Sequence, residues 1–425
     1  TTLDARNAGL RVEGGAVIDV SGVNQTVDMV ASGSIPGLER RTLDGHAGNV
    51  ILRAQGPVAL DGELRGQGGS ATAAGGSFSL ELKRPDGQTI LPDERRIVVK
   101  SGPASVPASA GFVDAAVDVS KLAAQGFEKL RLLSENRIVF QGDSTLAFER
   151  GIRLDAPLID VAQGAQVALR GSTVSLGQSL GDRQLTASGD ILVWQIVDGT
   201  ASPTLPTRAG TGVLDIDAGA VDLYGSLSIN GTQLTSIHSD SDIRLVGRPV
   251  VFAAEVAGGS QTTRQMGGLR TAGNLELDAA QIYPATRTGY TFRVSDQPTG
   301  TPTSGGSILV AANGNPPGKV YSAGGKLTLE ADTIRQAGTI KAPQGEIDLR
   351  AGTRLELASG SVTSVSSDGL TVPYGTTRAG LDWVYVDDPA APVSVLGSVS
   401  AAGKRIELSA PTIDAQAGST VDLSG

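Results

Sequence analysis

The protein has 425 residues, including 57 glycines, no cysteine and only 4% aromatic residues, while 40% of the residues are hydrophobic. The aliphatic content argues against a disordered chain, the scarcity of aromatic rings disfavours large globular cores, and the absence of cysteine excludes disulfides and thiolate metal sites. A net charge of −9 disfavours nucleic acid as a partner.

A repeated pattern of a glycine followed by alternating aliphatic residues predicts β-strands. It first occurs at Gly48, which is followed by Val50, Leu52 and Ala54 at every second position. Alternation with a period of two indicates a strand with one buried face. The pattern returns, with one extra residue in its last copy, at Gly212, Gly273, Gly306, Gly325, Gly345 and Gly403.

The spacing of these glycines predicts the fold class. Gly306, Gly325 and Gly345 are 19 and 20 residues apart, and the longer gaps of 61 and 58 residues are each interpreted as about three such units. A period near 20 with alternating aliphatic residues indicates a solenoid, and the turns are too short for the crossover helices of a doubly wound sheet. The predicted fold is all-β: a right-handed parallel β-helix of about 20 residues per coil with loop insertions.

One continuous β-helix segment is predicted over residues 1–425, interrupted by irregular insertions that lack the period. Insertions on a solenoid project from its corners and commonly carry binding functions. Only Ser120–Gln125 is expected to form a helical turn. The main insertions are predicted at 84–109, 199–210, 258–271, 284–305 and 366–393.

Stacking of the coils makes a specific expectation about side chains. If Gly325 lies over Gly345, then Glu330 falls beside Arg350 on the outer face, a mildly favourable pair of opposite charges. On the same strands Leu329 and Leu349 are expected to point into the core.

Several segments resemble the repeats of filamentous-haemagglutinin-type exoproteins, the large secreted partners of bacterial two-partner secretion. The resemblance rests on Gly324–Val362, on Ala8–Gly22 and Ala417–Gly425, and on the loop-like Val372–Tyr385. It implies a secreted protein of the bacterial cell surface, with the outer-membrane secretion pore of a two-partner system as a partner. The family's N-terminal secretion domain is not found in the sequence.

One group of aromatic residues is the candidate binding site. Tyr374, Trp383 and Tyr385 lie within twelve positions in the insertion 366–393, although the whole chain has only eight tryptophans and tyrosines. Their rings are suited to stacking on sugars or anchoring a protein partner. The alternative interpretation is that they cover an apolar flank of the coil.

No catalytic, cofactor or metal site is predicted. The acidic pairs Asp387–Asp388, Asp215/Asp217 and Asp240/Asp242 are interpreted as turn-forming residues, although β-helical polysaccharide-degrading enzymes place such groups on adjacent coils. His46 and His238 are assigned to the surface or to turns. No metal-protease, nucleotide-binding or calcium-repeat motif occurs in a usable context.

Three classes of function follow. The favoured one is a structural rod segment of a filamentous adhesin, which attaches cells to one another, to a biofilm or to a host through a polysaccharide or a cell-surface receptor. The alternatives are the stalk of a contact-dependent toxin-delivery exoprotein and a β-helical polysaccharide-degrading enzyme. Because both ends of the chain are repeat-like, end-to-end self-association is also expected.

Overall fold

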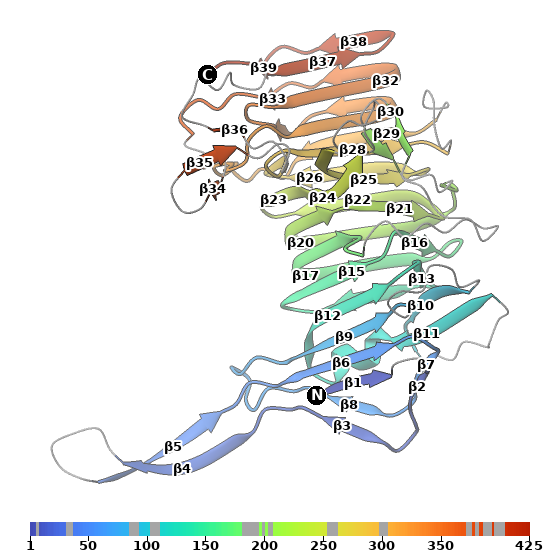
Figure 1. The fold of residues 1–425 in the computed structure, drawn as a ribbon, viewed down its shortest axis with the longest axis vertical. Coiled ribbons are helices and arrows are strands. Elements are labelled where there is room, and N and C mark those ends of the chain that lie inside the picture. Colours follow the sequence, from blue (N-terminus) through green and yellow to red (C-terminus); the bar gives the residue numbers. More distant parts are fainter. Residues whose placement is uncertain are drawn as a thin grey trace. The chain divides into compact units, whose positions relative to one another are not determined.

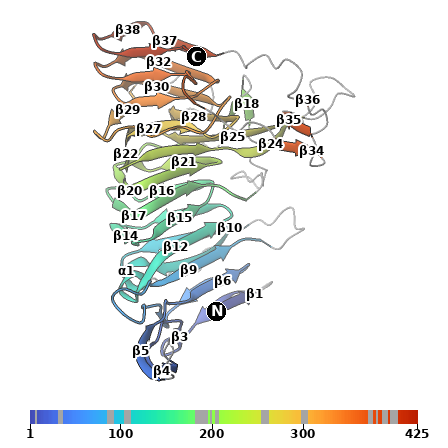
Figure 2. The ribbon, with the colours of Figure 1, turned by 90° about the vertical axis from the view of Figure 1, so that its left-hand side faces the viewer.

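The computed structural model describes residues 1–5, 8–30, 37–84, 93–102, 111–180, 195–197, 200–202, 207–252, 262–296, 305–370, 376–378, 382–385, 393–394 and 404–425. These residues form 39 strands and one short helix. Thirty of the strands belong to one large, mainly parallel sheet, as a β-helix requires (Figures 1 and 2). The predicted all-β, parallel β-helical fold is therefore confirmed. Two compact units can be distinguished, namely 1–156 with 165–174, and 157–164 with 175–425. The prediction of one continuous segment stays a prediction.

Unit 1 is built from stacked parallel strands that form three faces. The first stack comprises β1 (Thr2–Ala5), β6 (Asn49–Ala54), β9 (Gly76–Leu82), β12 (Phe127–Ser134) and β15 (Gly151–Asp155). The second comprises β2 (Leu10–Val12), β7 (Val58–Leu60), β11 (Phe112–Asp118), β10 (Glu94–Lys100) and β13 (Arg137–Phe140). The third face contains β3 (Val17–Asp19) with β8 (Glu63–Arg65), and β14 (Ser144–Ala147) with the first part of β17 (Gln166–Gly177).

Strands β10 and β11 correct the prediction of an irregular insertion at 84–109. Residues 94–100 of that range form β10, which pairs in parallel with both β11 and β13. Two strands that follow each other in the chain thus enter the same stack, so the segment breaks the coil order although it belongs to the sheet. The predicted helical turn is confirmed as α1 (Val119–Ala124), which begins where the Asp118 carboxylate accepts a hydrogen bond from the backbone N–H of Lys121.

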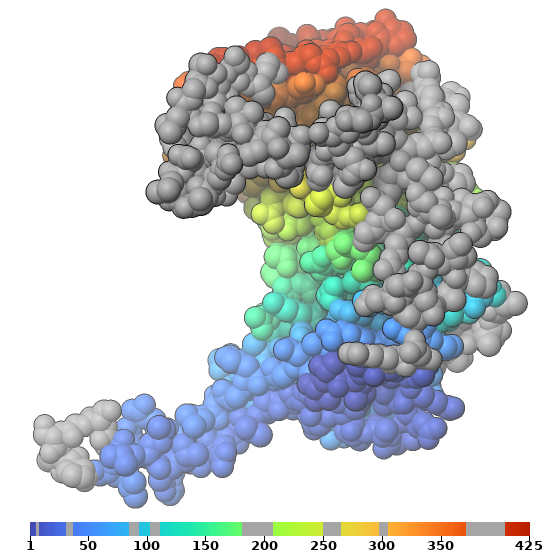
Figure 3. Space-filling model, viewed as in Figure 1, coloured from blue at the N-terminus to red at the C-terminus, as the bar shows by residue number. Residues whose placement is uncertain are grey.

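A hairpin extends from unit 1 as a sheet of its own. Strand β4 (Asn24–Val30) pairs antiparallel with β5 (Leu38–Asp44), and neither belongs to the parallel stacks. The ribbon and the space-filling view both show it reaching out from the body of unit 1 (Figures 1 and 3).

Unit 2 has three longer stacks, and three long strands each belong to two of them. Strands β30 and β32 pass from the first stack into the second, and β20 passes from the second into the third. The first comprises β16 (Leu158–Val161), β21 (Ser226–Asn230), β25 (Thr262–Thr271), β28 (Thr288–Val294), β30 (Lys326–Gln336), β32 (Glu346–Leu357) and β37 (Arg405–Ser409). The second comprises β20 (Gly212–Tyr224), β22 (Thr232–Ser239), β26 (Asn274–Ala279), β29 (Ser307–Ala312), the later parts of β30 and β32, and β38 (Thr412–Ala415). The third comprises the later part of β20, β23 (Asp242–Val246), β27 (Gln281–Pro284), β31 (Thr339–Lys341), β33 (Val362–Ser364) and β39 (Thr420–Asp422).

The core of unit 2 consists of aliphatic columns that run from coil to coil. Phe292, Leu329 and Leu349 occupy equivalent positions on successive strands, and each is at most 1% exposed. The predicted inward direction of Leu329 and Leu349 is therefore confirmed. Gly345 stacks on Gly325 so closely that a Cβ atom at Gly345 would lie 1.9 Å from the Gly325 carbonyl oxygen, which explains the glycine at this corner.

The glycine pattern marks the start of a strand but not a fixed place in the coil. Gly325 and Gly345 start equivalent strands of the first stack, whereas Gly306 precedes a strand of the second stack. The strands after Gly345 and Gly403 are direct neighbours, so the 58-residue gap is one coil step and not three. The gap from Gly212 to Gly273 likewise holds two steps, because only β22 intervenes.

Other predicted insertions also contain strands. Within 258–271 and 284–305, β25 and β28 pair in parallel as part of the first stack, and β25 also pairs antiparallel with β24 (Arg248–Phe252). Within 199–210, β19 (Thr200–Ser202) pairs antiparallel with β18 (Gln195–Val197). Within 366–393, β34 (Thr376–Arg378) and β35 (Asp382–Tyr385) form an antiparallel sheet with β36 (Val393–Ser394). These sequences are polar and contain glycine and proline, so the sequence pattern did not reveal their strands. The strands form by pairing with other strands of the chain.

Candidate functional site

The structure places two of the three predicted aromatic residues on one strand. Trp383 and Tyr385 belong to β35, where Trp383 pairs with Thr377 and Tyr385 pairs with Val393. Tyr374 lies outside the described residues. The aromatic group therefore belongs to a small antiparallel sheet and not to the parallel stacks, and its role in binding stays a prediction.

The predicted turn-forming acidic residues have mixed outcomes. Asp215 lies between the buried Leu214 and Ile216 in β20, and Asp217 follows Ile216 in the same strand, so their assignment to a turn is wrong. They occupy outward positions of a strand, which alternate with inward aliphatic residues. Asp240 lies in the bend before β23 and Asp242 is the first residue of that strand, whereas 387–388 lie outside the described residues.

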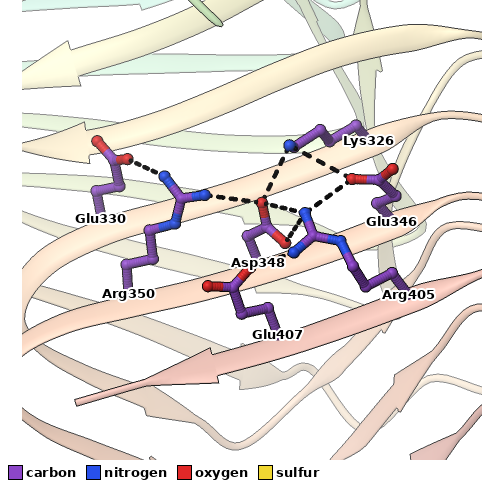
Figure 4. Close-up of polar contacts among 7 residues, drawn as sticks. All are labelled: Lys326, Glu330, Glu346, Asp348, Arg350, Arg405 and Glu407. Carbon is purple, nitrogen blue, oxygen red and sulfur yellow. Dashed lines mark hydrogen bonds and ion pairs between the residues drawn. The ribbon is translucent and has the colours of Figure 1, made fainter. Parts of the chain in front are cut away.

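A charged cluster on the outer face of the first stack of unit 2 is the most developed polar site. We call it the Asp348 cluster, and Figure 4 shows its members: Lys326, Glu330, Glu346, Asp348, Arg350, Arg405 and Glu407. They come from three successive strands, namely β30, β32 and β37. These strands are in register, so the outward side chains of neighbouring coils face one another.

Asp348 is the centre of this cluster. Its side chain is fully buried although it points outward, and it contacts three cations. Lys326 Nζ and Arg350 Nη2 each lie 3.1 Å from Asp348 Oδ2, and Arg405 Nη2 lies 3.0 Å from Asp348 Oδ1. The three cations come from three successive strands, β30, β32 and β37, so one carboxylate connects three coils of the stack.

The surrounding acidic residues complete the cluster. Glu346 accepts a hydrogen bond from Arg405 at 2.9 Å, and Glu330 accepts one from Arg350 at 3.4 Å, as expected from the sequence for Glu330 and Arg350. Hydrogen bonds to Glu346 and Glu407 raise the pKa of the Arg405 guanidinium. The cluster links side chains of three neighbouring strands, which suits it to fixing the register of the coils.

Replacing Asp348 by alanine is expected to destabilise unit 2 by about 2 kcal/mol, because three cations lose the buried carboxylate that they share and keep only their contacts with Glu330, Glu346 and Glu407. Denaturant unfolding measures this loss. Glu407→Ala is the control: Glu407 pairs with the same Arg405 but is 43% exposed, so a loss below about 1 kcal/mol is expected. Equal losses in the two variants would contradict a central role for Asp348.

A second polar site surrounds His238 on the outer face of the second stack. His238 Nδ1 lies 2.9 Å from Asp278 Oδ2, and Nε2 lies 3.6 Å from Asp240 Oδ1. Asp217 occupies the equivalent position on the neighbouring strand. Burial lowers the pKa of His238, but the hydrogen bond and charge of Asp278, together with Asp217 and Asp240, outweigh this effect and raise the pKa above 6.5.

This raised pKa predicts a pH-dependent stability with a definite sign. The charged imidazolium stabilises the fold fully below the unfolded-state value of about 6.5, and the contribution is lost as the pH rises through the higher folded-state pKa. The free energy of unfolding is therefore expected to fall above pH 6.5 in the native chain but not in His238→Gln. The other histidine provides the control, since His46→Gln retains His238 and should retain the decline. A decline that persists in His238→Gln would assign it to another group.

His46 has a different role, in agreement with its assignment to the surface or a turn. Its Nδ1 accepts a hydrogen bond of 2.8 Å from the backbone N–H of Ala74 and so ties two loops of unit 1 together. Neither histidine lies in a group that could hold a metal ion, because the part of the chain that the structure describes contains no cluster of three or more suitable ligands.

Comparisons with known proteins identify no relative: no family model, no curated protein and no solved structure matches this chain. The search for membrane-spanning helices, carried out on the described part of the chain, finds no helix that is long and apolar enough. The chain is thus defined by its parallel β-helical fold and by its outward polar clusters.

Two of these features were missed in the sequence. The Asp348 cluster joins residues up to 79 positions apart, from Lys326 to Arg405, and the long gap before Arg405 concealed that its strand follows β32 directly. His238 and Asp278 are 40 residues apart, which is two coil steps in the sequence-derived period but one in the structure. Had the correct register been recognised, it would have placed Arg405 beside the Asp348 cluster and His238 beside Asp278.

Proposed function

We propose that the chain is a structural segment of a secreted, cell-surface filamentous adhesin, which mediates attachment through loops carried on a β-helix. The observation that carries the proposal is that outward-facing charged residues form ion pairs between neighbouring coils. In unit 1, Glu81 contacts Arg53 at 3.2 Å and Arg131 at 2.6 Å, on the strands to either side. In unit 2, Glu330 contacts Arg293 and Arg350, both at 3.4 Å, in the same manner.

Such pairs support a scaffold function. Each outward pair fixes the register of neighbouring strands, and a slip by one residue would turn inward aliphatic side chains to the outside. A solenoid also gains stability from every neighbouring coil, so a long scaffold can be assembled from a light, glycine-rich chain. Such a scaffold suits an attachment protein, because its binding loops need a stable support at a distance from the cell.

Recognition is proposed to reside in the segments outside the stacks. The antiparallel sheet β34–β36 carries Trp383 and Tyr385, and aromatic side chains are suited to sugar rings and to protein anchors. The proposed ligand is a polysaccharide or a cell-surface receptor, and the resemblance to two-partner exoproteins adds an outer-membrane secretion pore as the export partner.

Attachment of protein-coated beads tests this function. Beads coated with the full chain are expected to bind bacterial or host cells, and the double variant Trp383→Ala/Tyr385→Ala is expected to reduce the bound number at least about tenfold, as for loss of an aromatic hot spot. Asp348→Ala serves as a stability control, because it weakens the scaffold without touching β35.

Two results would favour the alternatives. Release of reducing ends or unsaturated products from acidic polysaccharides by the purified chain would support a polysaccharide-degrading enzyme. A non-repetitive toxin domain after Gly425 in the complete reading frame would support a toxin-delivery stalk. Beads that bind no cells, in the absence of either result, would overturn the adhesive role.

A further inference from the structure

The β4–β5 hairpin exposes apolar surface that the rest of the described chain does not cover. Val30 and Leu38 are both 76% exposed, Leu43 and Met29 are nearly half exposed, and along β4 only Val27 is partly buried. A two-stranded ribbon is marginally stable in water, whereas three or more strands with an apolar face are stable. The hairpin therefore gains stability if another strand adds to one of its edges (Figure 3).

The two edges of the hairpin differ in charge. Strand β5 carries three consecutive charged residues, Glu39, Arg40 and Arg41, and charged side chains on an edge strand discourage strand addition. Strand β4 carries only Asp28, whose carboxylate is engaged by Arg40 through two hydrogen bonds of 2.8 and 3.1 Å. The open edge suited to pairing is thus that of β4.

The hydrogen-bond pattern shows which backbone groups of β4 face this open edge. Gly45 N–H donates to the Val23 carbonyl at 2.8 Å, and the register then places Asn24 opposite Asp44 and Val27 opposite Arg41. In an antiparallel ladder the hydrogen-bonded pairs alternate with non-bonded pairs. Positions 23, 25, 27 and 29 therefore bond toward β5, and the N–H and C=O groups of positions 24, 26, 28 and 30 point outward.

We propose that two copies of this chain associate by antiparallel pairing of their β4 strands, with Val27 of one copy opposite Val27 of the second copy. This register pairs Asn24 with Val30 and Thr26 with Asp28, and the reciprocal pairs follow from the two-fold symmetry. Every outward-facing backbone group of β4 then meets an outward-facing group. A shift by one residue would oppose bonded and outward positions, and a shift by two would shorten the overlap.

The side chains are compatible with this register. The two Val27 side chains form a non-hydrogen-bonded pair, in which side chains approach most closely. Met29 lies opposite Gln25 on the same face, and Asp28 lies opposite Thr26, so no two like charges face each other. The four-stranded sheet that results has a continuous apolar centre formed by Val27 and Met29 of both copies. This pairing goes beyond the proposed adhesive role and does not depend on it.

Two matched proline variants test the pairing edge in the full chain. Thr26 and Thr42 are opposite each other in a non-bonded pair, so the N–H of each points away from the other strand, Thr26 to the β4 edge and Thr42 to the β5 edge. Thr26→Pro removes two hydrogen bonds of the proposed dimer and is expected to raise its dissociation constant at least tenfold in sedimentation equilibrium. Thr42→Pro makes the same substitution on the opposite edge and is expected to leave it unchanged.

Single cysteines test the register, because the native chain contains none. Under mild oxidation, Val27→Cys is expected to give a disulfide-linked dimer, since the two Cβ atoms would face each other directly. Met29→Cys is expected to remain uncrosslinked, because its two copies would be four positions out of register.

Three results would overturn the proposal. The first is a native chain that is monomeric at about 100 μM and whose Val27→Cys variant crosslinks no more than Met29→Cys. The second is a dimer that survives Thr26→Pro. The third is a dimer that Thr42→Pro weakens as much as Thr26→Pro does. Capture of an added extended peptide by a chain that stays monomeric would reassign the β4 edge to a different partner. Circular dichroism of both proline variants verifies that the fold is retained.

Discussion

Replacing Leu329 by aspartate is expected to destabilise unit 2 by about 5 kcal/mol or more. Leu329 is 1% exposed and stacks between Phe292 and Leu349, so the substitution removes apolar packing and places a carboxylate in a layer of aliphatic and aromatic side chains. The loss should extend to neighbouring coils, because each coil is held mainly by its neighbours. Denaturant unfolding followed by circular dichroism measures it.

Leu309→Asp is the matched control for this substitution. Leu309 lies in unit 2 as well but occupies an outward, half-buried position on β29, opposite Glu276 on one side and Arg335 on the other. Repulsion from Glu276 and attraction to Arg335 offset each other, so a loss of at most about 1 kcal/mol is expected. Comparable losses at the two positions would show that the inward face has been assigned incorrectly.

The second large effect is expected at a buried ion pair of unit 1. Arg84 and Glu135 are 1% and 2% exposed at their side chains, and Arg84 Nε lies 2.6 Å from Glu135 Oε1. Glu135 Oε2 also accepts a hydrogen bond of 2.8 Å from the backbone N–H of Arg84. Glu135→Ala removes both contacts and leaves a buried guanidinium, so a loss of about 3–5 kcal/mol is expected in thermal or denaturant unfolding of the full chain.

An exposed pair in the same unit supplies the comparison. Glu63 accepts two hydrogen bonds of 2.9 Å from Arg65, but both side chains are more than 40% exposed. Glu63→Ala is therefore expected to cost at most about 1 kcal/mol. If Glu135→Ala is equally mild, then water or another group must compensate Arg84, and the pair contributes little to stability.

The repeated part of the fold was predictable because its signals are local. Leu329 and Leu349 alternate with polar residues along single strands, and the 20-residue step between them is uninterrupted, so both the inward face and the contact of Glu330 with Arg350 followed from the sequence. The helical turn was likewise visible within six residues. In each case the pattern and the contact it predicts lie within one coil step.

The remainder depends on pairing between distant segments. Strand β10 lacks the glycine pattern, and β11 lies between it and β7 in the stack, an order that no local period reveals. The burial of Asp348 likewise depends on Arg405, which reaches it only because β37 returns to the stack after a long departure. The candidate aromatic site was found from composition alone, since three large rings stand out in a chain that has few.

The return of β37 has a consequence for the entropy of the chain. Leu329 and Leu349 stack after a step of 20 residues, whereas Leu349 and Leu408 stack after a step of 59. Because the entropy cost of closing a loop grows only with the logarithm of its length, the longer step costs about 1 kcal/mol more than the shorter one. Five residues of β37 pair in register with β32, and backbone hydrogen bonds worth about 1 kcal/mol each offset a cost of this size. Segments of very different length can therefore be exchanged at this corner during evolution while the coils on either side remain joined.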